Sequence, residues 1–176
     1  MLRTVPLLIM FVLTIFLALG LFNSEVIDSI NRASTGKKFD NFEISSLASD
    51  KKFTPKIFEK NRRVTVVNVF ASWCKPCALE HDNIMKLAKE VYVYGIAWKD
   101  RPEDTFNYLK KNGNPFQLIG TDINGKTTVP MFLTGVPETF VLDGSGRIVL
   151  HYKSVITDEV LNDVMLPLIR KLQDKK

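Results

Sequence analysis

The sequence predicts an α/β domain, with a central mixed β-sheet flanked by helices, behind an apolar N-terminal membrane anchor. Three observations predict this class. Residues 64–70 and 92–98 have strand patterns, and a helical pattern follows each of them. Residues 139–152 have the composition of a hairpin. Strand–helix–strand units form right-handed parallel pairs, and the hairpin adds antiparallel strands, so the sheet should be mixed.

The composition is that of one folded domain with an extension. The chain has 176 residues, of which 45% are hydrophobic and 24% charged, which suffices for one ordinary core. Its formal net charge is +5, and the lysines are spread along the chain without a basic stripe between aromatics. This mild basicity suits an anionic membrane surface or an acidic partner, and it argues against nucleic-acid binding.

The start of the chain has the composition of a targeting segment. Residues 5–22 contain no charge, follow Arg3, and are about long enough for a hydrocarbon core of roughly 30 Å. An uncleaved signal anchor and a cleaved signal peptide, with its cleavage site at Ala18-Leu19-Gly20, both fit this pattern. The run exceeds a usual signal core, which favours an anchor over residues 1–22. Basic residues on both flanks leave its orientation open.

A polar spacer, residues 23–40, is expected to join the anchor to a domain over residues 41–176. In this domain, residues 42–47 should form a short edge strand, and residues 51–60 are polar and irregular. Residues 64–70 are nearly all apolar or β-branched, which is typical of a strand covered on both faces.

A helix over about residues 74–90 should follow, because apolar residues recur there at helical spacing. Residues 92–98 are the second expected strand. The next helix should start at the sequence Asp100-Arg101-Pro102-Glu103-Asp104, with an acidic first turn, and end before Gly113. Residues 116–119 are a candidate short strand.

The C-terminal part predicts a hairpin and a last helix. Residues 139–143 and 147–152 should pair across the turn Gly144-Ser145-Gly146. Thr157 is expected to cap the helix and Pro167 to kink it. The expected buried stripe repeats every fourth residue: Val160, Val164, Leu168 and Leu172.

The chain's only two cysteines, Cys74 and Cys77, are spaced C-x-x-C at the expected start of a helix. Free N–H groups and a partial positive charge at a helix N-terminus favour a thiolate and so lower a cysteine pKa. Lys75 adds a positive charge there. We therefore expect Cys74 to attack disulfides and Cys77 to resolve the mixed disulfide. Pro76 is tolerated because a first-turn N–H has no helical partner.

Other uses of the two cysteines fit less well. Two buried, inert thiols remain an alternative. A structural zinc site needs four ligands; besides the cysteines the chain offers only His81 and His151, and His151 lies in the distant hairpin. A peroxiredoxin-type site would have a threonine where Ala71 stands. No metal site is therefore expected.

Four stretches stand out beyond the cysteine spacing: Asn68–Cys77, Ala78–His81, Tyr94–Asp100 and Gly135–Phe140. Together they resemble the DsbE/CcmG thiol:disulfide interchange proteins of cytochrome c maturation, which are thioredoxin-like. The likeness runs from about residue 40 to the C-terminus. It implies a thioredoxin fold with a cis peptide bond before Pro137, in a loop that lies against the cysteine pair.

The resemblance also implies roles for neighbouring residues. The backbone of Val136, beside Pro137, would pair with an extended substrate segment. Trp73 would form a packed wall of the site. Glu80 and Glu138 match two acidic positions near the active site, where carboxylates tune a sulfur pKa and accept protons.

Three features are not explained by the family pattern. Lys75 stands where relatives often carry proline, which leaves the redox potential open. Residues 125–133 lack the acidic, glycine-rich character expected there, which leaves the recognition surface open. His81 matches the family but has no role that the sequence explains.

The resemblance implies an extracytoplasmic protein-disulfide oxidoreductase that reduces the disulfide of apocytochrome c, at its C-x-x-C-H motif, for haem attachment. Electrons would come from a membrane thiol carrier of the DsbD/CcdA type. The protein would be a single-pass protein of the inner membrane with its domain in the periplasm, and would need no cofactor besides its own disulfide. The alternatives are a general thioredoxin-like reductase or oxidase, and a non-enzymatic module that binds copper or an apoprotein. Related copper carriers have C-x-x-x-C spacing and an added histidine, which argues against the last alternative.

Overall fold

The computed structural model describes residues 9–15, 33–60 and 62–174. The chain divides into two units, residues 1–30 and 31–176. In the first unit residues 9–15 are helical, and the rest of the expected anchor lies outside the described residues, as does most of the expected spacer. None of the helices in the described part is long and apolar enough to cross a bilayer.

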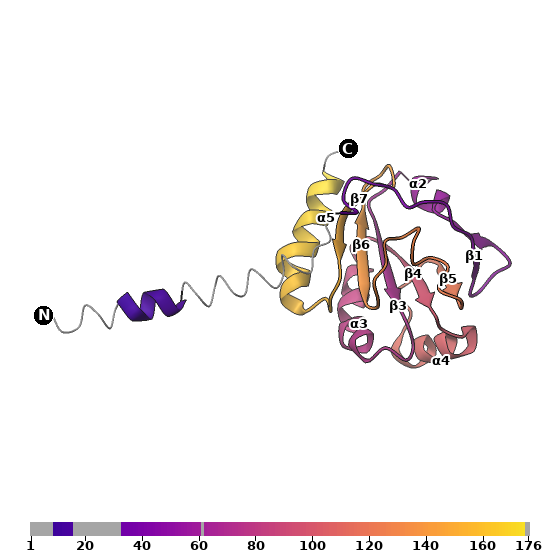
Figure 1. Cartoon of the computed structure of the whole chain (residues 1–176), viewed down its shortest axis with the longest axis horizontal. Coiled ribbons are helices and arrows are strands. Elements are labelled where there is room, and N and C mark those ends of the chain that lie inside the picture. Colours follow the sequence, from indigo (N-terminus) through magenta and orange to yellow (C-terminus); the bar gives the residue numbers. More distant parts are fainter. Residues whose placement is uncertain (1–8, 16–32, 61, 175–176) are drawn as a thin grey trace, which may run out of the picture. The chain divides into compact units, whose positions relative to one another are not determined.

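Within the described part, the second unit is built on a seven-stranded mixed sheet in the order β2-β1-β5-β4-β3-β6-β7 (Figure 1). The strand β3 is parallel to β4 and antiparallel to β6. The strand β5 is parallel to β4 and antiparallel to β1. The strands are β1 (Ile44–Ser46), β2 (Lys52–Phe53), β3 (Thr65–Phe70), β4 (Tyr92–Trp98), β5 (Ile119–Asp122), β6 (Glu138–Leu142) and β7 (Ile148–Tyr152).

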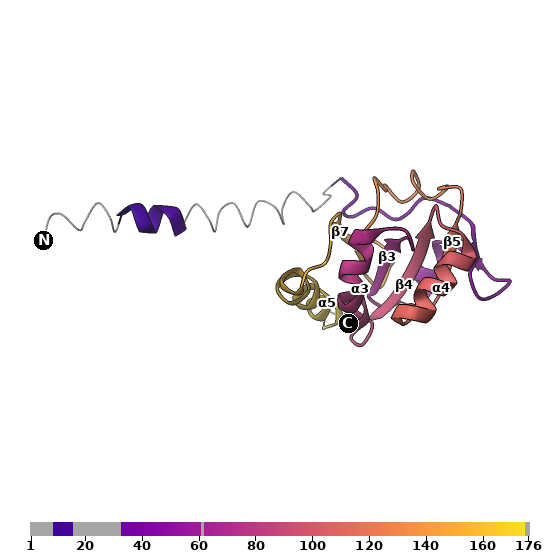
Figure 2. The same ribbon diagram turned by 90° about the horizontal axis from the view of Figure 1, so that it is seen from below.

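Helices cover one face of this sheet, and Figure 2 shows α3 and α4 in front of the strands, with α5 to the left of α3. The helix α3 (Lys75–Leu87) connects β3 to β4, and α4 (Pro102–Asn112) connects β4 to β5. Right-handed crossovers that progress in one direction place both helices on the same face. The C-terminal element starts as a π-helix, η1 (Val160–Met165), and continues as α5 (Leu166–Gln173).

An aromatic layer fills the opposite face. Phe39 packs edge-to-face on Phe58 of the short helix α2 (Lys56–Lys60) and on Phe140 of β6, with ring centroids 5.8 and 5.0 Å apart. Phe53 contacts Phe58 in the same manner at 5.8 Å. Such rings combine a large buried area with favourable edge-to-face contacts, so this layer anchors the chain that precedes β3.

The central elements confirm the sequence prediction. All six residues of β3 are buried, as expected of a strand covered on both faces. The strand β4 spans the predicted residues. The helix α4 stops at Gly113, whose φ of 93° suits glycine.

The prediction was wrong for residues 51–60, which form β2 and α2 instead of an irregular stretch. Phe53 and Phe58 are fully buried, and their packing overrides the polar composition around them. The strand β1 is therefore not at the edge, because β2 pairs outside it. The strand β5 begins at Ile119, later than predicted, because Phe116 packs over Gly95 and stacks on Phe70 with ring centroids 4.8 Å apart.

The last helix begins as predicted, since Thr157 Oγ1 accepts a hydrogen bond from the Val160 N–H at 3.2 Å. Its buried stripe differs from the prediction. Because η1 is a π-helix, in which the Leu166 N–H bonds the Leu161 carbonyl, the ideal 3.6-residue period does not hold. The fully buried residues are Val160, Leu161, Met165 and Ile169, while Val164, Leu168 and Leu172 are half-buried.

The described end of the expected spacer packs against the domain. The Gly36 N–H donates to the Ile148 carbonyl, and the Ile148 N–H donates to the Lys37 carbonyl, both at 2.8 Å. Ser34 and Phe39 are buried. Residues 34–37 therefore lie along β7.

Candidate redox site

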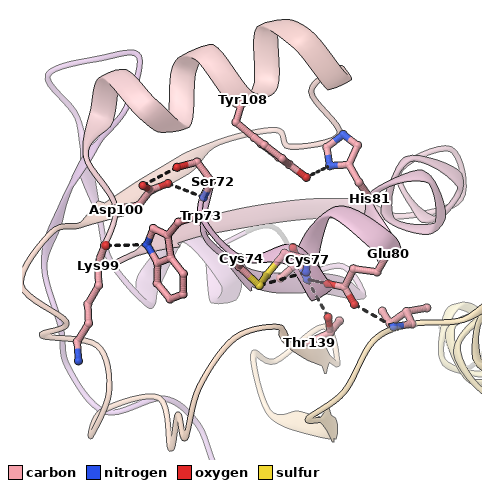
Figure 3. The surroundings of a disulfide bond; sticks show 12 residues. Ser72, Trp73, Cys74, Cys77, Glu80, His81, Lys99, Asp100, Tyr108 and Thr139 are labelled. Atoms are coloured by element: carbon pink, nitrogen blue, oxygen red, sulfur yellow. Dashed lines mark hydrogen bonds between the residues drawn. A yellow bond between two sulfur atoms is a disulfide. The ribbon is translucent and has the colours of Figure 1, made fainter.

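The two cysteines lie where β3 leads into α3. Cys74 is the N-cap of α3, and Cys77 lies in its first turn. They form a disulfide with their Cα atoms 5.3 Å apart (Figure 3). The Cys77 N–H donates to Cys74 Sγ at 3.1 Å. The sulfur of Cys74 thus lies at a helix N-terminus, where the dipole and a free N–H stabilise negative charge.

Three other predicted site residues adjoin the cysteines in the chain. Lys75 and Pro76, between the cysteines, are exposed. Trp73 is 57% exposed, and its Nε1–H donates to the Lys99 carbonyl at 3.0 Å. Lys99 has a φ of 49°, an uncommon conformation for a residue other than glycine. The bond to Lys99 holds the indole beside the disulfide, as Figure 3 shows.

Asp100 fixes the loop that precedes Cys74. Its buried carboxylate accepts hydrogen bonds at 2.8 Å from the N–H of Ser72, from Ser72 Oγ and from Thr105 Oγ1. One side chain therefore joins the redox loop to the start of α4. The sequence analysis placed Asp100 at a helix start and at the end of one family stretch but gave it no role at the site, so this role was missed.

Glu80 lies on α3 one turn beyond Cys77 and is only 1% exposed. Its Oε1 accepts from Asn68 Nδ2 at 2.8 Å, and its Oε2 accepts from the Ile156 N–H at 2.9 Å. Burial raises the pKa of Glu80 from 4.5 to about 7, against the opposing effect of these two hydrogen bonds. A buried carboxyl with that pKa exchanges its proton near neutral pH.

Asn68 extends this network across the sheet. Its Nδ2 also donates to Thr139 Oγ1 of β6 at 3.0 Å. The Ile156 carbonyl accepts from Asn83 Nδ2 at 2.8 Å, so both backbone groups of Ile156 bond to α3. Asn68 was missed as a site residue, although a polar residue within a buried strand was a visible signal.

Glu138, the other acidic residue that the resemblance assigned to the surroundings of the site, opens β6 directly after Pro137. Side chains alternate along a strand, so Glu138 points to the opposite face of β6 from Thr139, and therefore away from Glu80. Burial alone would raise the pKa of Glu138, but hydrogen bonds from His151 and Thr134 outweigh it and lower that pKa below its usual value.

The loop before β6 carries the remaining predicted residues. The peptide bond between Val136 and Pro137 is cis, as the family resemblance implied. Val69 of β3 pairs with Glu138, so the antiparallel register continues with Pro137 level with Phe70. This loop therefore lies at the end of the sheet that carries the cysteine pair.

His81 has a structural partner that the sequence did not reveal. Its Nε2 lies 3.1 and 3.2 Å from the carbonyl oxygens of Asn112 and Gly113, so this nitrogen is the donor. Its Nδ1 then accepts from the Tyr108 hydroxyl at 3.2 Å (Figure 3). Burial, and then the nearby Glu80 charge, raise the pKa of Tyr108, which keeps it a donor. His81 thus ties α3 to the end of α4.

Within the described residues, no group of three or more His, Cys, Asp or Glu side chains is placed to hold a metal ion.

A disulfide at the N-terminus of the helix after a central strand, with a cis-proline loop at the same end of the sheet, defines a thioredoxin-like thiol:disulfide oxidoreductase.

Curated relatives support this class. Over 143 residues the chain is 32% identical to the thiol:disulfide interchange protein HelX of Rhodobacter capsulatus, covering 81% of each chain. It is 32% identical to DsbE of Haemophilus influenzae over 153 residues, covering 86% of this chain and 84% of the relative. It is 30% identical to DsbE of Pasteurella multocida over 177 residues, covering 97% and 96%. The chain belongs to the DsbE family of thiol:disulfide interchange proteins.

Solved structures share the fold. A Chlorobium tepidum structure assigned to DsbE matches with a TM-score of 0.67 at 17% identity, covering 78% of this chain and 97% of that one. A secreted thiol-disulfide isomerase from Corynebacterium glutamicum matches with a TM-score of 0.65 at 22% identity, covering 80% and 89%. No family model matches the chain.

Proposed function

We propose that this member of the family reduces the disulfide of apocytochrome c, at its C-x-x-C-H motif, so that haem can be attached. The observation that best supports thiol:disulfide exchange at this site is the position of Cys74 at the N-cap of α3, with its sulfur facing the Cys77 N–H. That N–H and the helix dipole would stabilise the Cys74 thiolate after reduction, and the thiolate is the attacking species.

The proposed reaction has two exchange steps. The Cys74 thiolate attacks one sulfur of the substrate disulfide, so a mixed disulfide forms and the other substrate sulfur leaves as a thiolate. Cys77 then loses its proton and attacks Cys74 Sγ, which re-forms the Cys74–Cys77 disulfide and releases the second substrate thiolate. Two electrons pass to the substrate.

Glu80 is the proposed acceptor of the Cys77 proton. It lies one helical turn from Cys77, and its pKa of about 7 suits a group that accepts a proton near neutral pH. Its hydrogen bonds from Asn68 and the Ile156 N–H hold the carboxyl in place during the transfer.

The exposed indole of Trp73 and the cis-proline loop would receive the substrate. The Val136 backbone is proposed to pair with an extended segment beside the substrate cysteines, as an added strand does. Lys75 and Pro76 would shape the exposed rim between the cysteines.

The proposed setting is the periplasmic side of the inner membrane. The uncharged run of residues 5–22 supports a single anchor. A membrane thiol carrier of the DsbD/CcdA type would return electrons to the Cys74–Cys77 disulfide. No cofactor besides that disulfide takes part in the proposed steps.

The test uses the 176-residue chain and two oxidised substrates, a C-x-x-C-H peptide and insulin. We expect reduction of the peptide, with insulin turned over poorly. Cys74→Ser should abolish activity, and Cys77→Ser should trap the peptide as a mixed disulfide. Unchanged turnover by Cys74→Ser would reject the mechanism, and equal activity on insulin would favour a general thioredoxin-like reductase.

A further inference from the structure

A buried line of polar side chains runs from β6 across β7 to the start of the domain. Glu138, His151 and Ser34 are at most 1% exposed. His151 Nε2 lies 2.5 Å from Glu138 Oε2, and His151 Nδ1 lies 3.0 Å from Ser34 Oγ. The His151 ring stacks on Phe140, with centroids 3.9 Å apart. The proposed exchange steps use none of these groups.

The other oxygen of Glu138 is bonded to the cis-proline loop. Oε1 accepts from the Thr134 N–H at 2.7 Å, from the Thr134 hydroxyl at 2.5 Å and from the Gly135 N–H at 2.8 Å. These are the two residues that precede the Val136–Pro137 peptide bond. One carboxylate therefore fixes the backbone that leads into the cis proline.

This arrangement suits loop placement rather than proton transfer. Glu138 points to the face of β6 that lies away from Glu80, and its acceptor atoms are occupied by loop donors and His151. His151 donates to Glu138 Oε2, whereas the loop donors bond Oε1. Removing the His151 donor would leave a buried carboxylate oxygen without a partner, a costly state that the loop would relieve by moving.

We propose that His151 and Glu138 are positioning residues, which hold the backbone of residues 134–136 ready to pair with an extended segment of a disulfide-containing polypeptide. This inference rests on the proposed function, because it concerns how the same site receives a protein substrate. A small disulfide without peptide groups, such as 2-hydroxyethyl disulfide, has no backbone to pair with the loop, so its reduction does not depend on His151 and Glu138.

The test compares two oxidants of the reduced 176-residue chain, a disulfide-bonded C-x-x-C-H peptide and 2-hydroxyethyl disulfide. His151→Leu keeps the bulk of the side chain and removes the donor. We expect the KM for the peptide to rise about tenfold, the loss of roughly one hydrogen bond to a charged group. The rate with 2-hydroxyethyl disulfide and the Cys74 pKa should not change.

Rescue separates positioning from simple destabilisation. His151→Gln keeps an amide N–H within reach of Glu138 and should restore the peptide KM. Val149→Ala, a half-buried change on the same strand β7, is the matched control and should leave both oxidants unaffected. Equal losses with both oxidants, or a shifted Cys74 pKa, would overturn the proposal, as would an unchanged peptide KM in His151→Leu.

A second variant covers the case in which His151→Leu does not fold. Thr134 is exposed, so Thr134→Val should fold, and it removes one of the donors to Glu138 Oε1. The peptide KM should rise about threefold with the rate for 2-hydroxyethyl disulfide unchanged; an unchanged peptide KM would overturn the proposal. If the unmodified chain does not reduce the C-x-x-C-H peptide but reduces another peptide disulfide, the proposed apocytochrome c substrate is wrong. The KM comparison for the His151 and Thr134 variants is then made with that other peptide.

Discussion

Asn68 of β3 donates a hydrogen bond from Nδ2 to Glu80 Oε1 at 2.8 Å, beneath the disulfide. This bond joins the centre of the sheet to the helix that carries both cysteines. Glu80 remains buried with a pKa of about 7, since the two hydrogen bonds it accepts offset its burial only in part. Near neutral pH the carboxyl of Glu80 is therefore partly protonated beside the two sulfur atoms, and the folded chain loses stability when this proton is released.

The first prediction concerns stability against pH. The folded-state pKa of Glu80 lies above its ordinary 4.5, so its contribution to stability is fully present below pH 4.5 and is lost as the pH rises through about 7. Glu80→Gln lacks this titration. Urea unfolding of the oxidised chain should show that the parent loses roughly 3 kcal/mol more than Glu80→Gln between pH 4 and pH 8. The exposed Glu103→Gln should keep the parental slope, and parallel curves for Glu80→Gln and the parent would contradict the assignment.

The second prediction concerns the resolving step. Without the carboxylate of Glu80, Cys77 would have to lose its proton to water, so Glu80→Gln should slow resolution of the mixed disulfide by about 100-fold. The first attack, which depends on the Cys74 thiolate, should change little. Rapid-quench thiol trapping of a single turnover measures both steps. A mixed disulfide that does not accumulate would show that another base accepts the proton.

The fold was largely predictable because its central elements have strong local signals. The strand Thr65–Phe70 is continuously apolar or β-branched, and Gly113 marks the end of α4. The short elements β2 and α2 were not predictable, because two buried phenylalanines within a polar stretch stabilise them through distant contacts. The π-helix was missed because its hydrogen-bond pattern leaves no local sequence signal.

The site was predictable where residues are close in sequence. The cysteine spacing and the helix start placed Cys74, Lys75, Pro76 and Cys77 together, and the structure agrees. Contacts such as that between Ser72 and Asp100 join residues far apart in sequence and need the tertiary fold. The family pattern assigned Glu80 and Glu138 to the surroundings of the site, but their separate partners, Asn68 for Glu80 and the backbone of Gly135 for Glu138, could be found only from the structure.

The third prediction concerns Asp100. Asp100→Ala removes a buried acceptor and leaves the Ser72 N–H and hydroxyl without their partner, so the free energy of unfolding should fall by about 3 kcal/mol. Asp104→Ala is the matched control, since Asp104 pairs with Arg101 at 2.5 Å on the exposed side of the same helix start. It should cost less than about 1 kcal/mol. Urea denaturation compares them, and equal losses would contradict a special role for Asp100.

The fourth prediction concerns the close approach of Gly95 and Phe116, near the end of β3 that leads to Cys74. A Cβ on Gly95 would lie 2.9 Å from Phe116 Cγ, closer than atoms normally approach. The ring also stacks on Phe70, the last residue of β3, and so has little room to move. Gly95→Ala should therefore cost about 2 kcal/mol of unfolding free energy, typical of an overpacked core. Phe116→Leu in the Gly95→Ala background should recover part of that loss, because the smaller side chain makes room for the new methyl group. A double mutant whose loss equals the sum of the single losses would show that the strain lies elsewhere.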